Sequence, residues 1–263
     1  MQIKFKIFPL IGIAILLCLP AVLLLGGCGA GGVKPIEDSQ SQFKRAMELF
    51  NKKKYYEAET EFQRFIYNFP GNTAVDTAQY YLAMCYFDDN DYALAGGEFK
   101  KLLTSFPASA FADDAQYRLA MSHYHQSPNY YLDQTDTYIA IEEFLNFLDN
   151  YAISEFSDSA NFYLKEMRNK LARKTFKAGE LYQKLNEYDP AVLYYDRVLD
   201  DYADSPFSEE ALYHKGECLI SLKKDIRARD AFLEYIDKYE NGKFHKDATN
   251  KLRILEDKPQ AKK

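Results

Sequence analysis

A pattern of small and aromatic residues recurs five times along this chain of 263 residues. In each copy a small residue is followed twelve positions later by Ala and sixteen positions later by Phe or Tyr, and the third copy carries eight extra residues between the first two of these positions. The five sets are Ala46/Ala58/Phe62, Ala83/Ala95/Phe99, Ala120/Ala140/Phe144, Gly179/Ala191/Tyr195 and Gly216/Ala228/Phe232. The first two copies are offset by 37 residues, as are the last two. An internal repeat of this length indicates stacked supersecondary units that bury their apolar faces against one another.

The pattern resembles the tetratricopeptide repeat, a helix-turn-helix hairpin of about 34 residues. In that family small residues lie where the two helices cross, and a Pro such as Pro70 or Pro107 ends the second helix. The resemblance implies an all-α tetratricopeptide-repeat superhelix with about five helix hairpins and a C-terminal capping helix. Such arrays present an extended concave surface to peptides, so the repeat favours a binding protein over an enzyme.

Turn residues and apolar periodicity divide the chain beyond residue 38 into predicted helices. Their ranges are 39–53, 56–69, 73–88, 91–106, 110–126, 136–151, 156–185, 188–202, 206–222, 225–239 and 244–256. The seventh is long because Phe144 and Tyr195 are 51 residues apart, which is 37 plus 14. Fourteen residues make almost four helical turns, so such an insertion lengthens a helix and keeps its apolar face in phase. The alternative is two helices with a kink near Arg173.

The first residues of the chain have the features of a bacterial export signal. Lys4 and Lys6 precede an apolar stretch over 7–25, which ends in Leu25-Gly26-Gly27-Cys28. This ending resembles the lipobox of bacterial lipoproteins, and the resemblance implies cleavage before Cys28 and acylation of that residue. An uncleaved membrane helix is the alternative, which the Pro and Gly residues of the stretch disfavour. Gly29 after the Cys favours the outer membrane, and the absence of an acidic cluster close behind favours its periplasmic face.

These features predict a division of the chain into five parts. They are a lipoprotein signal peptide (1–27), a lipidated flexible tether (28–38), a first module of repeats one to three (39–151), a long linking helix with a second module of repeats four and five (152–239), and a capping helix and tail (240–263).

Composition and motifs argue against several other functions. The net charge of −6 disfavours nucleic acid as a partner. The sequence contains no phosphate-binding Gly loop, no nucleophile elbow and no zinc-helix motif, and His123 and His125 point apart on a helix. We therefore expect no catalytic residues, no metal site and no cofactor. Cys85 and Cys218 occupy equivalent sites three repeats apart, too far for a disulfide, and are expected to be buried thiols.

A narrower resemblance rests on the order of the features. A lipobox, a tether, five repeats, an insertion in repeat three reading Leu132-Asp133-Gln134-Thr135, and Lys170-Leu171-Ala172-Arg173 in the long helix together resemble the BamD family of outer-membrane assembly lipoproteins. The likeness covers essentially the whole mature chain. One departure is that the turns after Tyr151 and Tyr202 lack the Pro that the family usually has, so the preceding helices are expected to end less sharply.

Nine residues are candidates for a peptide-binding groove. In a tetratricopeptide hairpin the first helix lines the groove three residues before, one after and four after the small crossing residue. In repeats one to three all nine of these positions are aromatic or Met: Phe43, Met47, Phe50, Tyr80, Met84, Phe87, Tyr117, Met121 and Tyr124. Such a strip offers adaptable apolar contact to extended segments. The alternative is that these side chains pack inside the array, although repeats four and five have more polar residues at the same positions.

The resemblance implies partners for both halves of the array. Repeats one to three are expected to bind unfolded outer-membrane barrel proteins, and repeats four and five to dock onto a BamA-like barrel-inserting subunit. N-terminal acyl chains would hold the protein on the membrane. The alternative function is a periplasmic adaptor lipoprotein for cell-wall synthesis or division complexes, although no heptad run precedes Phe43.

Two surface features complete the predictions. The inserted loop over 130–137 is expected to cap the following helix through Thr135 or Asp136. A basic run on the long helix is either a solvated face or a docking strip for an acidic partner. Its residues are Lys165, Arg168, Lys170, Arg173, Lys174 and Lys177.

Overall fold

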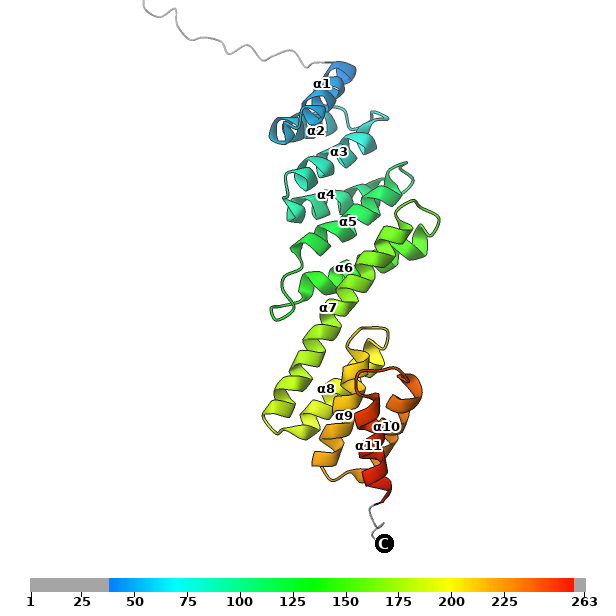
Figure 1. The fold of residues 1–263 in the computed structure, drawn as a ribbon. Helices are drawn as coiled ribbons and strands as arrows, with labels where there is room; N and C mark the ends of the chain where they lie inside the picture. The colour runs from blue at the N-terminus through cyan, green and yellow to red at the C-terminus, as the bar shows by residue number, and fades with distance from the viewer. Residues whose placement is uncertain (1–37, 258–263) are drawn as a thin grey trace, which may run out of the picture. The chain divides into compact units, whose positions relative to one another are not determined.

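The computed structural model describes residues 38–257, and all regular secondary structure in this range is helical (Figure 1). The helices are α1 (Ser39–Asn51), α2 (Tyr55–Asn68), α3 (Val75–Asp88), α4 (Tyr92–Ser105), α5 (Ala112–Gln126), α6 (Thr135–Asn150), α7 (Ser157–Lys184), α8 (Tyr188–Asp201), α9 (Ser208–Ser221), α10 (Asp225–Lys238) and α11 (His245–Glu256). This is the predicted tetratricopeptide-repeat superhelix. The predicted signal peptide, Cys28 and most of the tether lie outside the described residues, as do 258–263. No helix within 38–257 has the length and apolarity needed to cross a membrane.

Each helix packs mainly against the next one along the chain, so the array grows by nearest neighbours (Figure 1). The long helix α7 is one unbroken element of 28 residues, which confirms the prediction of a single long helix. It packs against both the preceding helix α6 and the following helix α8, and so links two sets of hairpins. The predicted capping helix is α11, which packs on α10 and buries Ala248 and Leu255.

Small residues allow the two helices of each hairpin to approach closely. The five predicted crossing residues and their Ala partners are fully buried or nearly so, and the aromatics that follow them, such as Phe62, Phe144 and Phe232, are completely buried. In repeats four and five the ring lies directly on a glycine. A Cβ atom on Gly179 would lie 2.8 Å from the Tyr195 ring, and one on Gly216 would lie 2.6 Å from the Phe232 ring. Only a hydrogen atom fits in those places.

The turns between repeats share one way of starting the next helix. The side-chain oxygens of Asn72, Ser109, Ser154 and Ser205 each accept a hydrogen bond from the backbone N–H two residues later, at 2.9 to 3.4 Å. Asx and Ser turns of this kind hold the backbone as it enters a helix. They explain why the helices after these turns begin without a side-chain N-cap of the usual kind.

The helices that precede the turns without Pro end as sharply as the others. The aromatic C-caps Tyr151 and Tyr202 donate their N–H groups to the carbonyls four residues earlier, at 2.8 and 3.1 Å, as Phe106 does before Pro107, at 2.7 Å. The expectation of less defined helix ends at these turns was therefore wrong. The C-cap at each of these turns is an aromatic residue, and the helix ends there whether or not a Pro follows.

Cys85 and Cys218 are buried free thiols, as predicted. Burial raises the pKa of each thiol to about 12, so both stay protonated and unreactive at neutral pH. They pack as small apolar side chains in separate core clusters.

We predict opposite effects for two Gly→Ala substitutions within helices. Gly216→Ala places a methyl group against the buried Phe232 ring and should destabilise the protein by about 1–3 kcal/mol. Gly97→Ala in α4 meets no atom within 4 Å and should stabilise it by about 0.5–1 kcal/mol through helix propensity. Urea unfolding followed by circular dichroism measures both. Equal effects of the two substitutions would contradict the close approach at Gly216.

Candidate peptide-binding site

The structure divides the nine predicted groove residues into two groups. Tyr80, Met84, Tyr117 and Met121 are buried, with at most 9% of their surface exposed. The other five are half-buried: Phe43, Met47, Phe50, Phe87 and Tyr124. The four buried side chains belong to the core clusters of repeats two and three. They pack inside the array, which is the alternative to a groove role. Only the half-buried group presents surface to a ligand.

From repeat two onward, the residue three positions before the crossing residue joins each repeat to the helix that follows it. Tyr80 stacks on Phe111 with ring centroids 4.5 Å apart, and Tyr117 stacks on Phe156 at 4.8 Å. The more C-terminal repeats use the same joint, with Phe176 against Phe207 at 5.5 Å and Tyr213 stacked on Phe244 at 4.2 Å. The second aromatic of each pair lies in the following turn.

The sequence contained a signal for these joints. The aromatic in the turn follows the first-helix aromatic by 31 residues in repeats two, four and five, and by 39 in repeat three, which has eight extra residues. Phe43 is the exception, because the corresponding turn residue is Ala74, and Phe43 packs against Phe62 and Phe65 instead.

Two of the joints also carry a hydrogen bond from tyrosine to aspartate. The Tyr80 hydroxyl donates to the Asp114 carboxylate, which also accepts from Arg118 Nε at 3.0 Å. The Tyr213 hydroxyl donates to Asp247 in the same way. Each aspartate follows its tyrosine by 34 residues. Burial, followed by the neighbouring carboxylate, raises the pKa of both phenols far above the usual range. These tyrosines are therefore neutral, satisfied structural groups.

Three of the half-buried residues, Phe50, Phe87 and Tyr124, form an aromatic edge at the C-terminal ends of α1, α3 and α5. Phe50 contacts Tyr81 edge-on at 5.1 Å between ring centroids, and Phe87 contacts Tyr92 at 5.3 Å. Tyr124 contacts Tyr163 of α7 at 4.7 Å. Edge-to-face contacts hold these rings in fixed orientations and leave part of each ring accessible.

Two more residues belong to this edge. His125 stacks on Tyr92 with centroids 4.4 Å apart, and burial lowers the pKa of its imidazole, so the ring is neutral and adds apolar surface. Tyr163 was missed because it belongs to α7, outside the predicted repeats. The Tyr124 hydroxyl also donates to Glu166 of α7 at 3.1 Å. Burial together with this carboxylate raises the pKa of Tyr124 to about 12.

The equivalent surface of repeats four and five is polar. Glu180 pairs with Lys177, and Glu217 accepts from His214 at 3.1 Å and lies 3.3 Å from Lys251. The hydrogen bond from His214 and the charge of Lys251 lower the pKa of Glu217. Gln183 accepts a hydrogen bond from Tyr195 at 2.6 Å. The change in character predicted along the array is therefore present at these positions.

The basic run on α7 makes contacts within the chain. Lys170 Nζ donates to Ser127 Oγ at 2.8 Å, and Arg173 lies over the Tyr130 ring at 4.3 Å. Lys174 Nζ donates to the carbonyl of Leu132. Arg173 and Lys174 fasten the inserted loop to α7, and Lys170 fastens the end of α5 just before it. Arg168 reaches in the other direction, to Asp204 at 3.1 Å in the turn after α8.

The inserted loop starts α6 differently from the prediction. The helix begins at Thr135 with Gln134 as its N-cap, and neither Thr135 nor Asp136 caps it. Asp133 accepts from the Thr135 N–H at 2.9 Å, and Asp136 lies 3.1 Å from His123 Nδ1. The Gln134 amide donates to three loop carbonyls and so fixes the loop internally.

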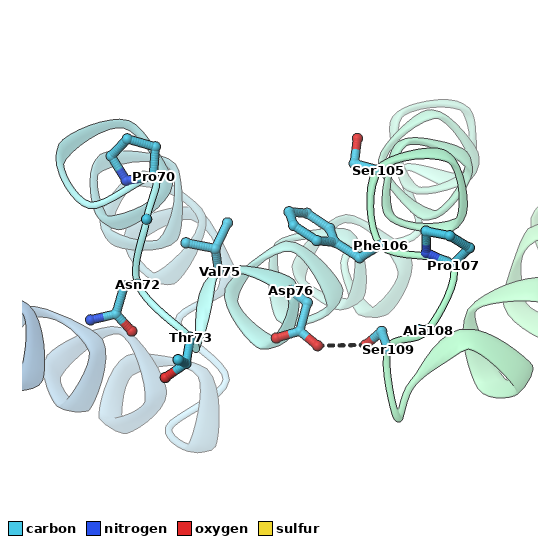
Figure 2. A pocket seen from close by; sticks show the side chains of 11 residues that line it. Pro70, Asn72, Thr73, Val75, Asp76, Ser105, Phe106, Pro107, Ala108 and Ser109 are labelled. Atoms are coloured by element: carbon cyan, nitrogen blue, oxygen red, sulfur yellow. Dashed lines mark hydrogen bonds between the residues drawn. The ribbon is translucent and has the colours of Figure 1, made fainter.

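A cleft of about 510 Å³ lies at a different edge of the array, between two inter-repeat turns (Figure 2). Pro70 and Pro107 stand on opposite sides of it, and Ser109 Oγ donates to Asp76 Oδ2 at 2.7 Å (Figure 2). Its lining is Pro, Ala, Val, Phe and small polar residues, with Asp76 as the single charged side chain. No group of three or more possible metal ligands occurs within residues 38–257.

Helix hairpins with small crossing residues, stacked by nearest neighbours, define a tetratricopeptide scaffold for protein–protein interaction. The sequence profile of the YfiO family, described as outer membrane lipoproteins, matches residues 36–229. The chain belongs to this family. No curated protein sequence matches the chain.

Solved structures similar to this chain share low sequence identity with it, and several of them are described as tetratricopeptide-repeat proteins. MamA is 15% identical, with a TM-score of 0.36, and covers 77% of this chain and 92% of its own. The TPR2AB domain of yeast Sti1, in its complex with pHSP90, is 12% identical, with a TM-score of 0.46 and 83% of each chain covered. A repeat protein of Bacteroides fragilis is 13% identical, with a TM-score of 0.44, and covers 83% of this chain and 98% of its own.

We predict that Met84→Glu lowers the free energy of unfolding by about 3 kcal/mol or more, because it places a carboxylate in the core of repeat two. Met47→Glu at the equivalent half-buried position of repeat one should cost about 1 kcal/mol. Chemical denaturation of both variants provides the comparison. Equal small losses would show that Met84 is a groove residue and not a core residue.

Proposed function

We propose that this lipoprotein is a scaffold and recognition subunit of the outer-membrane β-barrel assembly machinery, the role implied by its resemblance to BamD. Family membership places it among outer membrane lipoproteins. The observation that carries the proposal is the aromatic edge of repeats one to three beside the polar surface of repeats four and five. A scaffold of this kind needs no catalytic residues, metal or cofactor of its own.

Repeats one to three bind extended apolar segments of unfolded barrel proteins along the aromatic edge. Phe50, Phe87 and Tyr124 supply the ring contacts, and Met47 and Phe43 extend the surface along α1. Their rings and thioether are partly accessible and are backed by a rigid core. The buried residues beneath this edge support it and do not touch the client. They are Tyr80, Met84, Tyr117 and Met121. Rings fixed before binding lose little conformational entropy when a client binds.

Repeats four and five dock onto a BamA-like barrel-inserting subunit. Their surface presents ion pairs such as Glu180 with Lys177 and a carboxylate at Glu217 with a lowered pKa. Charged, hydrogen-bonded surfaces favour a defined partner over many related segments. In this arrangement residues 39–151 form the client-binding module, and 152–239 form the linking helix and docking module.

Acyl chains on Cys28 anchor the protein to the periplasmic face of the outer membrane. Each buried methylene contributes about 0.8 kcal/mol, so several chains give essentially permanent attachment. The tether between Cys28 and α1 then sets the distance from the bilayer within which repeats one to three work.

A photo-crosslinking amino acid at Phe87 or Tyr124 should capture unfolded outer-membrane barrel protein in cells, because both side chains belong to the partly accessible edge. The matched controls are Gln183 and Ile220, which hold the equivalent positions in repeats four and five and should capture no client. Mass spectrometry identifies the products. Capture of the barrel-inserting subunit alone at Phe87 and Tyr124 would refute client binding, and capture of peptidoglycan synthases would favour the cell-wall adaptor.

Cys28→Ala should move the protein from the outer-membrane fraction to a soluble or inner-membrane fraction, since the acceptor thiol for the lipid is lost. Fractionation and mass spectrometry of the mature N-terminus measure the change. The control is Cys85→Ala, a buried thiol, which should leave localisation unchanged. An acylated outer-membrane protein in the absence of Cys28 would contradict the anchor assignment.

A further inference from the structure

Four first-helix aromatics of the array share one environment. Tyr80, Tyr117, Phe176 and Tyr213 each lie three residues before a crossing residue and are 1–9% exposed. Each is covered by a Phe from the turn that leads into the next first helix. The cover comes from the chain itself, because another helix follows: the first helix of the next repeat, or the capping helix α11 after repeat five.

The N-terminal half of α7 repeats the pattern of α5 at an offset of 45 residues, which is 37 plus the eight-residue insertion. Phe156 corresponds to Phe111 at the N-cap, and both precede their helix by one residue. Ala160 corresponds to Ala115, and both are fully buried. By the same offset Phe162 corresponds to Tyr117. The N-terminal half of α7 is thus built as the first helix of a further repeat.

No second helix and no turn follow this half of α7, because the chain continues straight to Lys184 (Figure 1). The place of the crossing residue is taken by Lys165, an exposed side chain, where α5 has the buried Ala120. Gln116 of α5 donates to Glu143 of its hairpin partner α6 at 2.7 Å, whereas the corresponding Asn161 donates within residues 38–257 to the carbonyl of Ser157 in its own helix.

Phe162 is 64% exposed as a result. Its exposure distinguishes Phe162 from the four covered rings. Phe162 also differs from other exposed aromatics, such as Tyr67, in what the equivalent repeat positions hold. The positions equivalent to Tyr67 in the other repeats are Thr104, Asp149, Asp200 and Asp237, all of them exposed and polar. Exposure is thus the rule at the position of Tyr67 and the exception at the position of Phe162.

We propose that Phe162 is the docking point for a protein partner that presents an aromatic side chain from a turn and so completes the missing repeat joint. The site is continuous with the interface between α6 and α7. Tyr163 stacks parallel to Phe144 at 6.2 Å and contacts Phe162 edge-on at 5.3 Å, so a ring seated on Phe162 extends an aromatic cluster that is already rigid. The four joints inside the chain show which ligand fits: a Phe or Tyr from a turn that enters a helix. This inference rests on the repeat geometry and does not require the client groove.

A photo-crosslinking amino acid at position 162 of the full lipoprotein, in the cells that make it, tests the proposal, with the same amino acid at Tyr67 as the matched exposed control. The expected product joins position 162 to one identified partner, within a turn that contains Phe, Tyr or Trp. Phe162→Ala, and Ala at that partner aromatic, should each weaken co-purification at least about tenfold. Tyr67→Ala should not.

Four results would overturn the proposal. They are a crosslink to the chain's own N-terminal segment, a crosslink to lipid, products scattered over partner surfaces without an aromatic, and unchanged co-purification after Phe162→Ala. Thermal unfolding of Phe162→Ala should match that of the parent protein, because the ring is already exposed. Crosslinks at Phe87 and Tyr124 report separately on the client groove, so the failure of one proposal does not decide the other.

Discussion

From repeat two onward the array depends on a pair of aromatic rings that pack against one another at each joint, and three of the four pairs are stacked. In a solenoid each repeat contacts only its neighbours, so stability is close to a sum of repeat and joint contributions. A stacked aromatic pair contributes about 0.5–1.5 kcal/mol beyond the burial of its surface. Where the joint also holds a hydrogen bond from Tyr80 to Asp114 or from Tyr213 to Asp247, the ring is fixed in rotation as well. The joints therefore set the register of one hairpin on the next.

The helices and their order could be predicted from the sequence, because the small crossing residues and their spacing are local signals. The role of the groove positions could not be read from one helix. Helical periodicity shows that Tyr80 and Met84 share a face, but whether that face is covered depends on Phe111 in the next turn. The spacing of 31 residues between Tyr80 and Phe111 carried this information and recurs in repeats four and five. Two of the repeat positions argued to bind peptide on sequence grounds, three before and one after the crossing residue, are thus core positions in repeats two and three.

The basic run on α7 illustrates a second limit. A run of Lys and Arg on a helix is usually solvated, and composition alone does not show otherwise. Here Lys170, Arg173 and Lys174 reach the connection between α5 and α6, some 40 residues earlier in the chain, while Arg168 reaches the turn after α8. The insertion and the long helix are two separate departures from the 37-residue period, and the structure brings them together. The three cations contact a hydroxyl, an aromatic ring and a backbone carbonyl, none of them charged. These contacts couple the first set of hairpins to the long helix, which continues into the second set.

The aromatic joints between repeats also explain where the accessible surface of the array lies. A regular repeat hides its first-helix aromatic in the next joint, so the rings left for partners are those near the helix ends and those where the repeat pattern is interrupted. Phe87 and Tyr124 belong to the first kind, and Phe162 belongs to the second. Because all three are attached to packed clusters, they meet a partner in orientations that the core has already fixed. The interruption that creates α7 both lengthens the scaffold and uncovers one joint surface, and in a chain built from repeats the second effect follows from the first.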